Sequence, residues 1–110
     1  MAGKVELKHA GVGEFMSNLK APNGEIILTS ELYQAKAGAK NGIQSVRENA
    51  ISDSRFEDRV SARFEMYFVL KAANGEIIGT SEMYSCGSAR DNCKAAVKKY
   101  ASDVAIEDQT

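Results

Sequence analysis

Two carboxylate and tyrosine pairs come closest to the residue types and spacing of an active site. Glu31 stands two residues before Tyr33, and Glu82 stands two residues before Tyr84. Paired carboxylates can divide general acid and general base work between them, as in glycoside hydrolysis. Both pairs fall at corresponding positions of an internal repeat, however, and duplication copies charge without requiring chemistry. We therefore predict no catalytic residues, and an enzyme is the least favoured function.

Few other side chains could bind a metal or act as a nucleophile. The chain has one histidine, His9, and two cysteines, Cys86 and Cys93. On one helix, seven residues at about 1.5 Å each would separate the cysteine Cα atoms by about 10 Å, whereas a disulfide tolerates up to about 7 Å. There is no C-x-x-C spacing for a zinc site. The sequence predicts free buried thiols and a surface histidine, with no metal and no cofactor.

One stretch of the chain occurs twice. Residues 19–33 and 70–84 are identical at 12 of 15 positions, with a constant shift of 51 residues. Such agreement indicates two copies of one supersecondary unit. Because 110 residues are enough for one domain, we expect a single domain, 1–110, made of two repeats at about 3–52 and 54–108.

Each copy begins with a pattern typical of strands. The Asn-Gly pairs at 23–24 and 74–75 favour a type I′ hairpin turn with a two-residue loop. Such a loop would place Leu19 opposite Leu28 on the core face of the sheet. The strands expected from alternation are 5–8, 15–21, 25–32, 56–60 and 104–108.

A helical period follows the third strand of each copy. In the first copy the apolar stripe consists of Ala39, Ile43, Val46 and Ala50. In the second copy it moves by one residue, to Cys86, Ala89, Cys93, Ala96 or Val97, and Tyr100. The shift predicts that the second helix is rotated about its axis relative to the first.

The repeated words resemble a known family. Both copies read Leu-Lys-Ala-x-Asn-Gly-Glu-Ile-Ile-x-Thr-Ser-Glu-x-Tyr, and residues 41–50 add Asn-Gly-Ile-x-Ser-Val-x-x-Asn-Ala. Over nearly its whole length the chain is similar to the YegP-like family of small uncharacterised bacterial proteins. That resemblance implies an α+β fold of two tandem β-β-β-α-β repeats with pseudo-two-fold symmetry. The repeats would share one antiparallel sheet, with helices on one face, C-terminal strands exchanged and strand 56–60 joining the halves. It implies no known activity and no catalytic residues.

The sheet face opposite the helices is the predicted place for function. With the pairing set by a two-residue loop, the side chains predicted to lie on this outer face are Tyr33, Tyr67, Val69, Lys71, Ile78, Thr80, Glu82 and Tyr84. Exposed faces that mix aromatic, β-branched and charged groups can bind partners, although antiparallel sheets often leave one face in water. We expect a non-enzymatic interaction module that binds a protein or peptide through this face or a sheet edge.

Single-stranded nucleic acid is the alternative ligand, because tyrosines and lysines on a sheet can stack bases. The net charge of -1 and the interspersed glutamates argue against it. The chain also has no apolar run long enough for a signal peptide or a membrane span. We expect a cytoplasmic protein that is a monomer with an internal pseudo-dimer.

Overall fold

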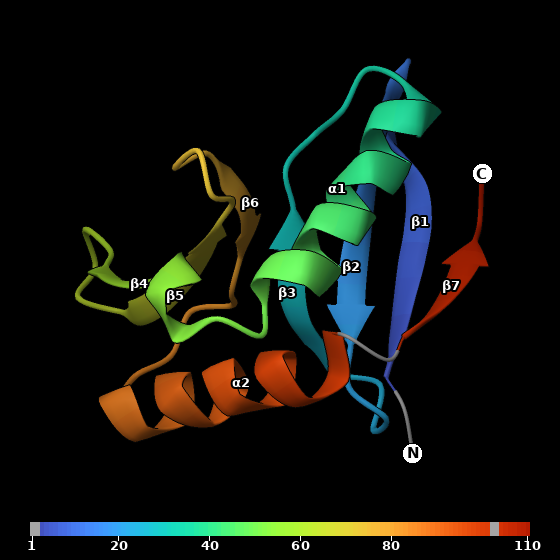
Figure 1. The fold of residues 1–110 in the computed structure, drawn as a ribbon. Helices are drawn as coiled ribbons and strands as arrows, with labels where there is room; N and C mark the ends of the chain where they lie inside the picture. The colour runs from blue at the N-terminus through green and yellow to red at the C-terminus, as the bar shows by residue number, and fades with distance from the viewer. Residues whose placement is uncertain (1–2, 102–103) are drawn as a thin grey trace.

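The two halves of the chain contain the same elements in the same order (Figure 1). The computed structural model describes residues 3–101 and 104–110. The first half contains β1 (Lys4–Gly11), β2 (Glu14–Lys20), β3 (Ile26–Ser30) and α1 (Lys36–Asn49). After the short 3-10 helix η1 (Asp53–Arg55), the second half contains β4 (Phe56–Val60), β5 (Met66–Lys71), β6 (Ile77–Thr80) and α2 (Gly87–Tyr100), and β7 (Ala105–Asp108) ends the chain. The predicted α+β fold of two tandem repeats is confirmed.

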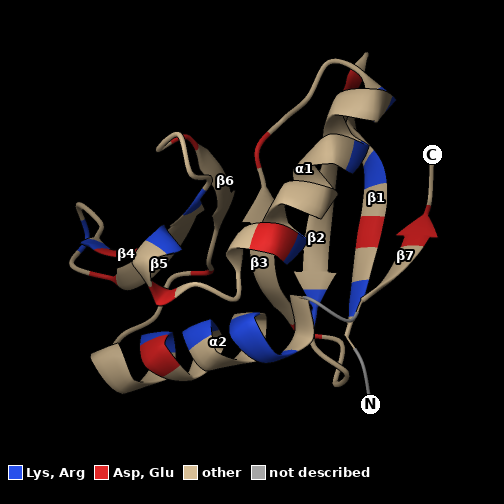
Figure 2. Ribbon diagram, viewed as in Figure 1, with Lys and Arg blue, Asp and Glu red and all other residues tan. Residues whose placement is uncertain are grey.

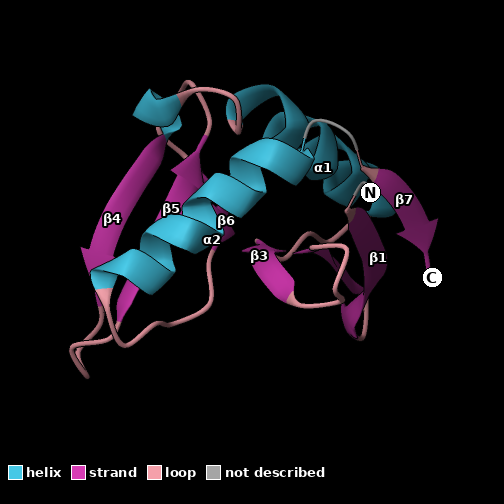
Figure 3. Cartoon of the chain, turned by 90° about the horizontal axis from the view of Figure 1, so that it is seen from below, coloured by secondary structure: helices cyan, strands magenta, loops and turns pink. Residues whose placement is uncertain are grey.

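All seven strands form one sheet in the order β4-β5-β6-β3-β2-β1-β7. β4 opens the second half and pairs with β5 of the same half, whereas β7 follows α2 but pairs with β1 of the first half. The predicted exchange is therefore confirmed for the C-terminal strand, β7, while strand 56–60, which was expected to join the halves, ends the sheet. The sheet is mixed rather than purely antiparallel, because β7 runs parallel to β1. Both helices cover the same face of the sheet, as Figures 1 and 3 show.

The hairpin turns have three-residue loops, so the predicted two-residue turns are wrong. The Gly24 N–H donates to the Ala21 carbonyl over 2.9 Å, and the Ala21 N–H donates to the Glu25 carbonyl over 3.0 Å. Gly24 has a φ of +89°, in the left-handed region that glycine adopts without strain. Leu19 still faces Leu28, as predicted, but the extra loop residue makes a β-bulge at Ile27.

A second irregularity follows at the far end of each hairpin. The Ser17 N–H donates to the Ser30 hydroxyl over 2.8 Å, and that hydroxyl donates to the Glu31 carbonyl. The Ser30 hydroxyl thus takes the place of a backbone carbonyl as the acceptor for Ser17. One extra residue is accommodated on the β3 side of the ladder as a result, and Phe15 pairs with Tyr33. Ser81 makes the same pair of bonds in the second copy. A slip of one residue turns the following side chains to the other face of the sheet.

The two copies meet at β3 and β6, where the repeat must depart from symmetry. Leu28 and Gly79 occupy corresponding positions, one on either side of the point where Thr29 pairs with its own equivalent, Thr80. A Cβ atom on Gly79 would lie only 2.7 Å from Leu28 Cδ2 and 2.8 Å from Leu28 Cγ. The Leu28 side chain therefore crosses the pseudo-dyad and occupies the space that a side chain at position 79 would need.

The two helices bury corresponding positions. Val46 and Val97 are buried at equivalent places, as are Ala50 and Ala101, and Cys93 is buried where α1 has Gly42. The predicted rotation of the second helix is therefore wrong. The stripe only looked shifted because cations stand at two positions that are apolar in α1.

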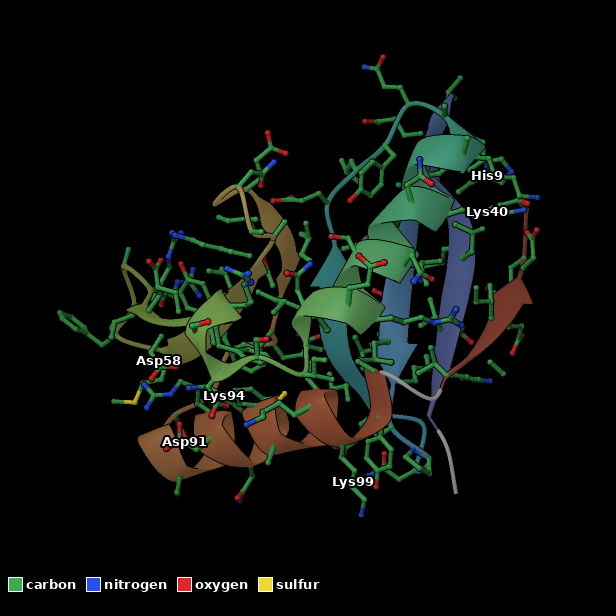
Figure 4. The ribbon with its side chains drawn as sticks, viewed as in Figure 1. His9, Lys40, Asp58, Asp91, Lys94 and Lys99 are labelled. Carbon is green, nitrogen blue, oxygen red and sulfur yellow. The ribbon has the colours of Figure 1, made fainter. Side chains whose placement is uncertain are left out.

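Those cations form an ion cluster where the first copy has apolar core. Asp58 takes the position of Leu7, which is fully buried, and Arg90 and Lys94 take the positions of Ala39 and Ile43. Lys94 Nζ lies 2.6 Å from an Asp58 carboxylate oxygen, and Arg90 lies 3.5 Å from the other (Figure 4). The three substitutions compensate one another, since each charge is paired.

Candidate functional site

The structure divides the eight predicted site residues between two faces. Tyr67, Val69, Lys71 and Thr80 lie on the outer face, and Val69 stands opposite Thr80 as predicted. Glu82 lies beyond the end of β6 and is exposed. Val69 is buried although it lies on the outer face, where Glu57 and Thr80 are its cross-strand neighbours.

Tyr33, Tyr84 and Ile78 lie on the helix-covered face, so their predicted placement is wrong. The bulge at the hairpin turns Ile78 inward into the core cluster, and the extra residue after the serine turns the tyrosines inward. A Cβ atom on Gly42 of α1 would lie 2.5 Å from the Tyr33 hydroxyl. These three residues therefore join the sheet to the helices rather than forming an exposed surface.

Groups with metal-binding or nucleophilic chemistry are dispersed. His9 is exposed and packs its ring 4.9 Å from Phe15, far from Asp58 and Lys94 (Figure 4). Cys93 is buried, but Cys86 is exposed, which corrects the prediction that both thiols are buried. Within residues 3–101 and 104–110, no three His, Cys, Asp or Glu side chains come together as metal ligands. None of the helices described there has the length and apolar character needed to cross a membrane.

A single row of residues crosses the outer face from one edge of the sheet to the other. The cross-strand partners follow one another as Glu107, Glu6, Asn18, Thr29, Thr80, Val69 and Glu57. The middle of the row is uncharged, and carboxylates stand toward both ends. Figure 2 shows basic and acidic segments alternating along β1, beside the acidic segment of β7.

The outer-face charges are paired in the same way in both copies. Lys20 Nζ lies 2.9 Å from Glu6, and the equivalent Lys71 Nζ lies 3.0 Å from Glu57. Lys4 adds a third contact of this kind, 3.1 Å from Glu107 on β7. These lysines are already neutralised, which makes the face a poor match for a phosphate backbone.

Acid should weaken the fold through these pairs. The bond from Lys20 lowers the pKa of the Glu6 carboxyl below its ordinary value of 4.5. The resulting stabilisation is complete above the unfolded-state pKa and is lost as the pH falls through the lower folded-state pKa. We expect Glu6→Gln to lower the free energy of unfolding by about 1 kcal/mol at pH 7, measured by urea denaturation. At pH 3 the difference from wild type should shrink. Glu31→Gln is the control, and an equal pH effect there would contradict the assignment.

The backbone groups at the two ends of the sheet differ in their partners. The Ser61 N–H donates to the Glu65 carbonyl, so at Ser61 the backbone faces the partner strand. In an antiparallel pair every second residue faces its partner strand in this way, and the backbone groups of Glu57 and Arg59 therefore bond to β5. The N–H groups of Asp58 and Val60 and the C=O groups of Phe56, Asp58 and Val60 then point away from the sheet, whereas the Phe56 N–H donates to the Asp53 carbonyl of η1. Side-chain patterns in the sequence do not show that these backbone groups are unpaired. The position of β4 at the end of the strand order does show it.

The corresponding edge of the first copy is covered. Val5, Leu7 and His9 occupy the equivalent positions on β1, and β7 pairs along this strand with Val5 opposite Ile106. The Gln109 N–H donates to the Leu7 carbonyl over 2.7 Å. The protein therefore covers one of two equivalent edges with its own last strand.

The turn next to the open edge contains an unusual residue. Phe64 has a φ of +62° and occupies the position at which the first copy has Gly13, whose φ is +74°. A bulky residue in the left-handed region is uncommon and costs conformational energy. Phe64 is also 84% exposed, so packing within the protein contributes little to offset this conformational energy.

Comparison with known proteins gives a consistent match along the chain. The family described as "Domain of unknown function (DUF1508)" matches residues 12–57 and again residues 64–108. The UPF0339 protein ACIAD0721 of Acinetobacter baylyi is 46% identical over 110 residues, covering 100% of this chain and 99% of that one.

Two solved structures have the same fold. The solution structure of UPF0339 protein SO3888 from Shewanella oneidensis is 47% identical, with a TM-score of 0.91, and the match covers 98% of this chain and 92% of that one. The solution structure of yegP from E. coli, described as a protein of unknown function, is 44% identical, with a TM-score of 0.94 over 100% of this chain and 95% of that one. The repeat, the fold and these likenesses agree, and the chain belongs to the DUF1508 family of YegP-like proteins, with two copies of the family's domain in tandem.

Proposed function

We propose that this protein is a non-enzymatic interaction module that binds an extended segment of another protein as an added strand on the β4 edge. The observation that carries the proposal is the unequal treatment of two equivalent edges. β7 pairs with the outward groups of β1, whereas β4 ends the sheet, and Asp58 and Val60 there are exposed. Adding a strand to an open edge is a recurring mode of peptide recognition.

The strand that covers β1 indicates the chemistry of the segment that would cover β4. β7 reads Ala-Ile-Glu-Asp and places Glu107 3.1 Å from Lys4. Arg55 takes the position of Lys4 beside the open edge, and among the residues that the structure describes it forms no ion pair. A segment that alternates apolar and acidic residues suits these surroundings, and by analogy with β7 it would run parallel to β4.

Two further observations support the edge over the outer face. The exposed Phe64 lies in the turn that follows β4. A partner that buried its ring would gain binding energy that offsets the strain of its left-handed backbone. On the outer face, by contrast, the charged groups are already paired with one another, and two of the predicted tyrosines lie elsewhere. A partner at the edge would also pair with the five backbone groups of β4 that point away from the sheet, which are the N–H groups of Asp58 and Val60 and the C=O groups of Phe56, Asp58 and Val60.

The test uses the chain's own last strand as a probe. An acetylated peptide with the sequence of residues 104–110 is titrated into ¹⁵N-labelled protein and followed by two-dimensional NMR. We expect millimolar binding, with shifts at the amides of Asp58 and Val60. Shifts confined to β1 and β7 would mean that the peptide merely displaces its own copy, and they would contradict the proposal.

A proline makes the test specific for the outward groups. Asp58→Pro removes one outward N–H without removing a bond to β5, and edge strands tolerate proline. We expect this variant to lose peptide binding while it keeps its circular dichroism spectrum. The matched control, Asp58→Asn, keeps the N–H and should bind as wild type does. Equal binding by both variants would rule out strand addition.

A further inference from the structure

A pocket of about 510 Å³ opens between the two halves, on the helix side of the sheet. The first copy contributes the tip of its β2–β3 hairpin, including Glu25 and Ile27. The second copy contributes Tyr84, Cys93 and Tyr100. Alanines, a proline and Ile27 give the walls an apolar character, and a few polar groups converge on them. This combination is typical of small-molecule sites.

Two substitutions within the repeat change how the tyrosine packs against the helix on this side. In the first copy, α1 has Gly38 and Gly42, and the ring of Tyr33 packs directly on them. α2 has Ala89 and Cys93 at the same positions. Since a Cβ atom on Gly42 would lie 2.5 Å from the Tyr33 hydroxyl, Tyr84 cannot pack on Cys93 in the same way. Tyr84 instead makes a side-chain contact with the Cys93 thiol, and both residues line the pocket.

The charge around the pocket is negative. Glu25, which lines it, and Glu82 are exposed, and neither takes part in an ion pair with any residue that the structure describes. Burial chiefly raises the pKa of Tyr84, and the Cys93 contact and the two carboxylates raise it further, so the phenol stays neutral. Among the described residues that line the pocket there is no lysine or arginine. The Lys99 ammonium lies at its margin, 5.4 Å from the Tyr100 ring.

We infer that this pocket binds a small organic cation, a protonated amine that carries an apolar body. The carboxylates of Glu25 and Glu82 would attract the ammonium group, and the neutral phenol of Tyr84 would offer a hydrogen-bond partner. Tyrosine rings also attract cations to their faces, as the Lys99 contact with Tyr100 illustrates. The apolar body would lie against Ile27 and the alanines of α2.

Three probes of one shape test the charge requirement. Benzylamine, benzyl alcohol and benzoate are each titrated into ¹⁵N-labelled protein at low salt. We expect benzylamine to shift the amides of Tyr84, Cys93 and Ala96, and to bind at least tenfold more tightly than the other two. Equal binding of benzyl alcohol, or stronger binding of benzoate, would overturn the inference, as would no binding of benzylamine.

Variants test the location. Glu25→Gln and Glu82→Gln should each weaken benzylamine binding about threefold, in line with the energy of an exposed ion pair. Ala96→Leu fills the pocket and should abolish binding, whereas Ala95→Leu, on the exposed side of α2, should leave it unchanged. Undiminished binding by Ala96→Leu would place the ligand elsewhere and overturn the assignment. None of these variants alters the β4 edge, so the result is independent of the proposed strand addition.

Discussion

Replacing Gly79 with leucine should lower the free energy of unfolding by about 3 kcal/mol. The new side chain would need the space that Leu28 already fills, since even a Cβ atom there would lie 2.7 Å from Leu28 Cδ2. Leu28 is almost fully buried in the core and has little room to move away. Urea denaturation followed by circular dichroism measures the loss.

The pseudo-dyad offers an internal control for this prediction. The double variant Leu28→Gly and Gly79→Leu exchanges the two residues between equivalent strands, so it restores one leucine and one glycine at the centre. We expect a coupling energy of about 2 kcal/mol between the two changes, typical of residues in direct contact. Additive effects, within about 0.5 kcal/mol, would show that the two positions do not share one space.

Phe68→Ala should cost about 4 kcal/mol, the largest effect that we expect from a truncation in this core. The ring is fully buried, and it packs edge-on against Phe56 with ring centroids 5.5 Å apart. Ser17 stands at the equivalent place in the first copy.

Ser17→Ala is the matched control for Phe68→Ala. Ser17 is also buried, but its alanine variant removes one oxygen atom and keeps the backbone N–H that Ser30 binds. We expect it to cost less than about 1 kcal/mol. Equal losses from the two variants would mean that the halves depend on these positions alike, contrary to the packing described above.

The architecture could be predicted because the repeat determines it. Two copies with the same hairpin and helix signals must bury the same faces, and the family resemblance supplied the exchange of strands. The register at the turns could not be predicted from Asn-Gly alone, because that pair suits both a two-residue loop and a three-residue loop with Gly24 in the left-handed region. Pro22 was the overlooked signal, since proline favours the second position of a type I turn.

The ion cluster was missed for a different reason. Read one residue at a time, Lys94 in place of Ile43 indicates a rotated helix. The same shift of 51 residues also turns Leu7 into Asp58 on the strand beneath, and the two changes together predict a buried contact replaced by an ion pair. Periodicity describes one helix at a time, whereas this signal lies in residues that contact each other across elements.

The predicted site suffered from the same limit. Tyr33 and Tyr84 were assigned to the outer face from an unbroken ladder, and a single extra residue at Ser30 and Ser81 reverses them. The pocket and the β4 edge depend on how the two copies sit against each other. A comparison of Ala89 and Cys93 with the two glycines of α1 would have pointed to the pocket, since larger side chains there must move the tyrosine.

The central claim is that the fold covers one of two equivalent edges and leaves the other open for a partner. Native-state amide hydrogen exchange on the free protein tests it at one pair of equivalent residues. The Leu7 amide faces β7 and should be protected, whereas the Asp58 amide points away from the sheet and should exchange almost as fast as in an unfolded chain. Protection of Asp58 equal to that of Leu7 would show that the edge is already covered and would contradict the account.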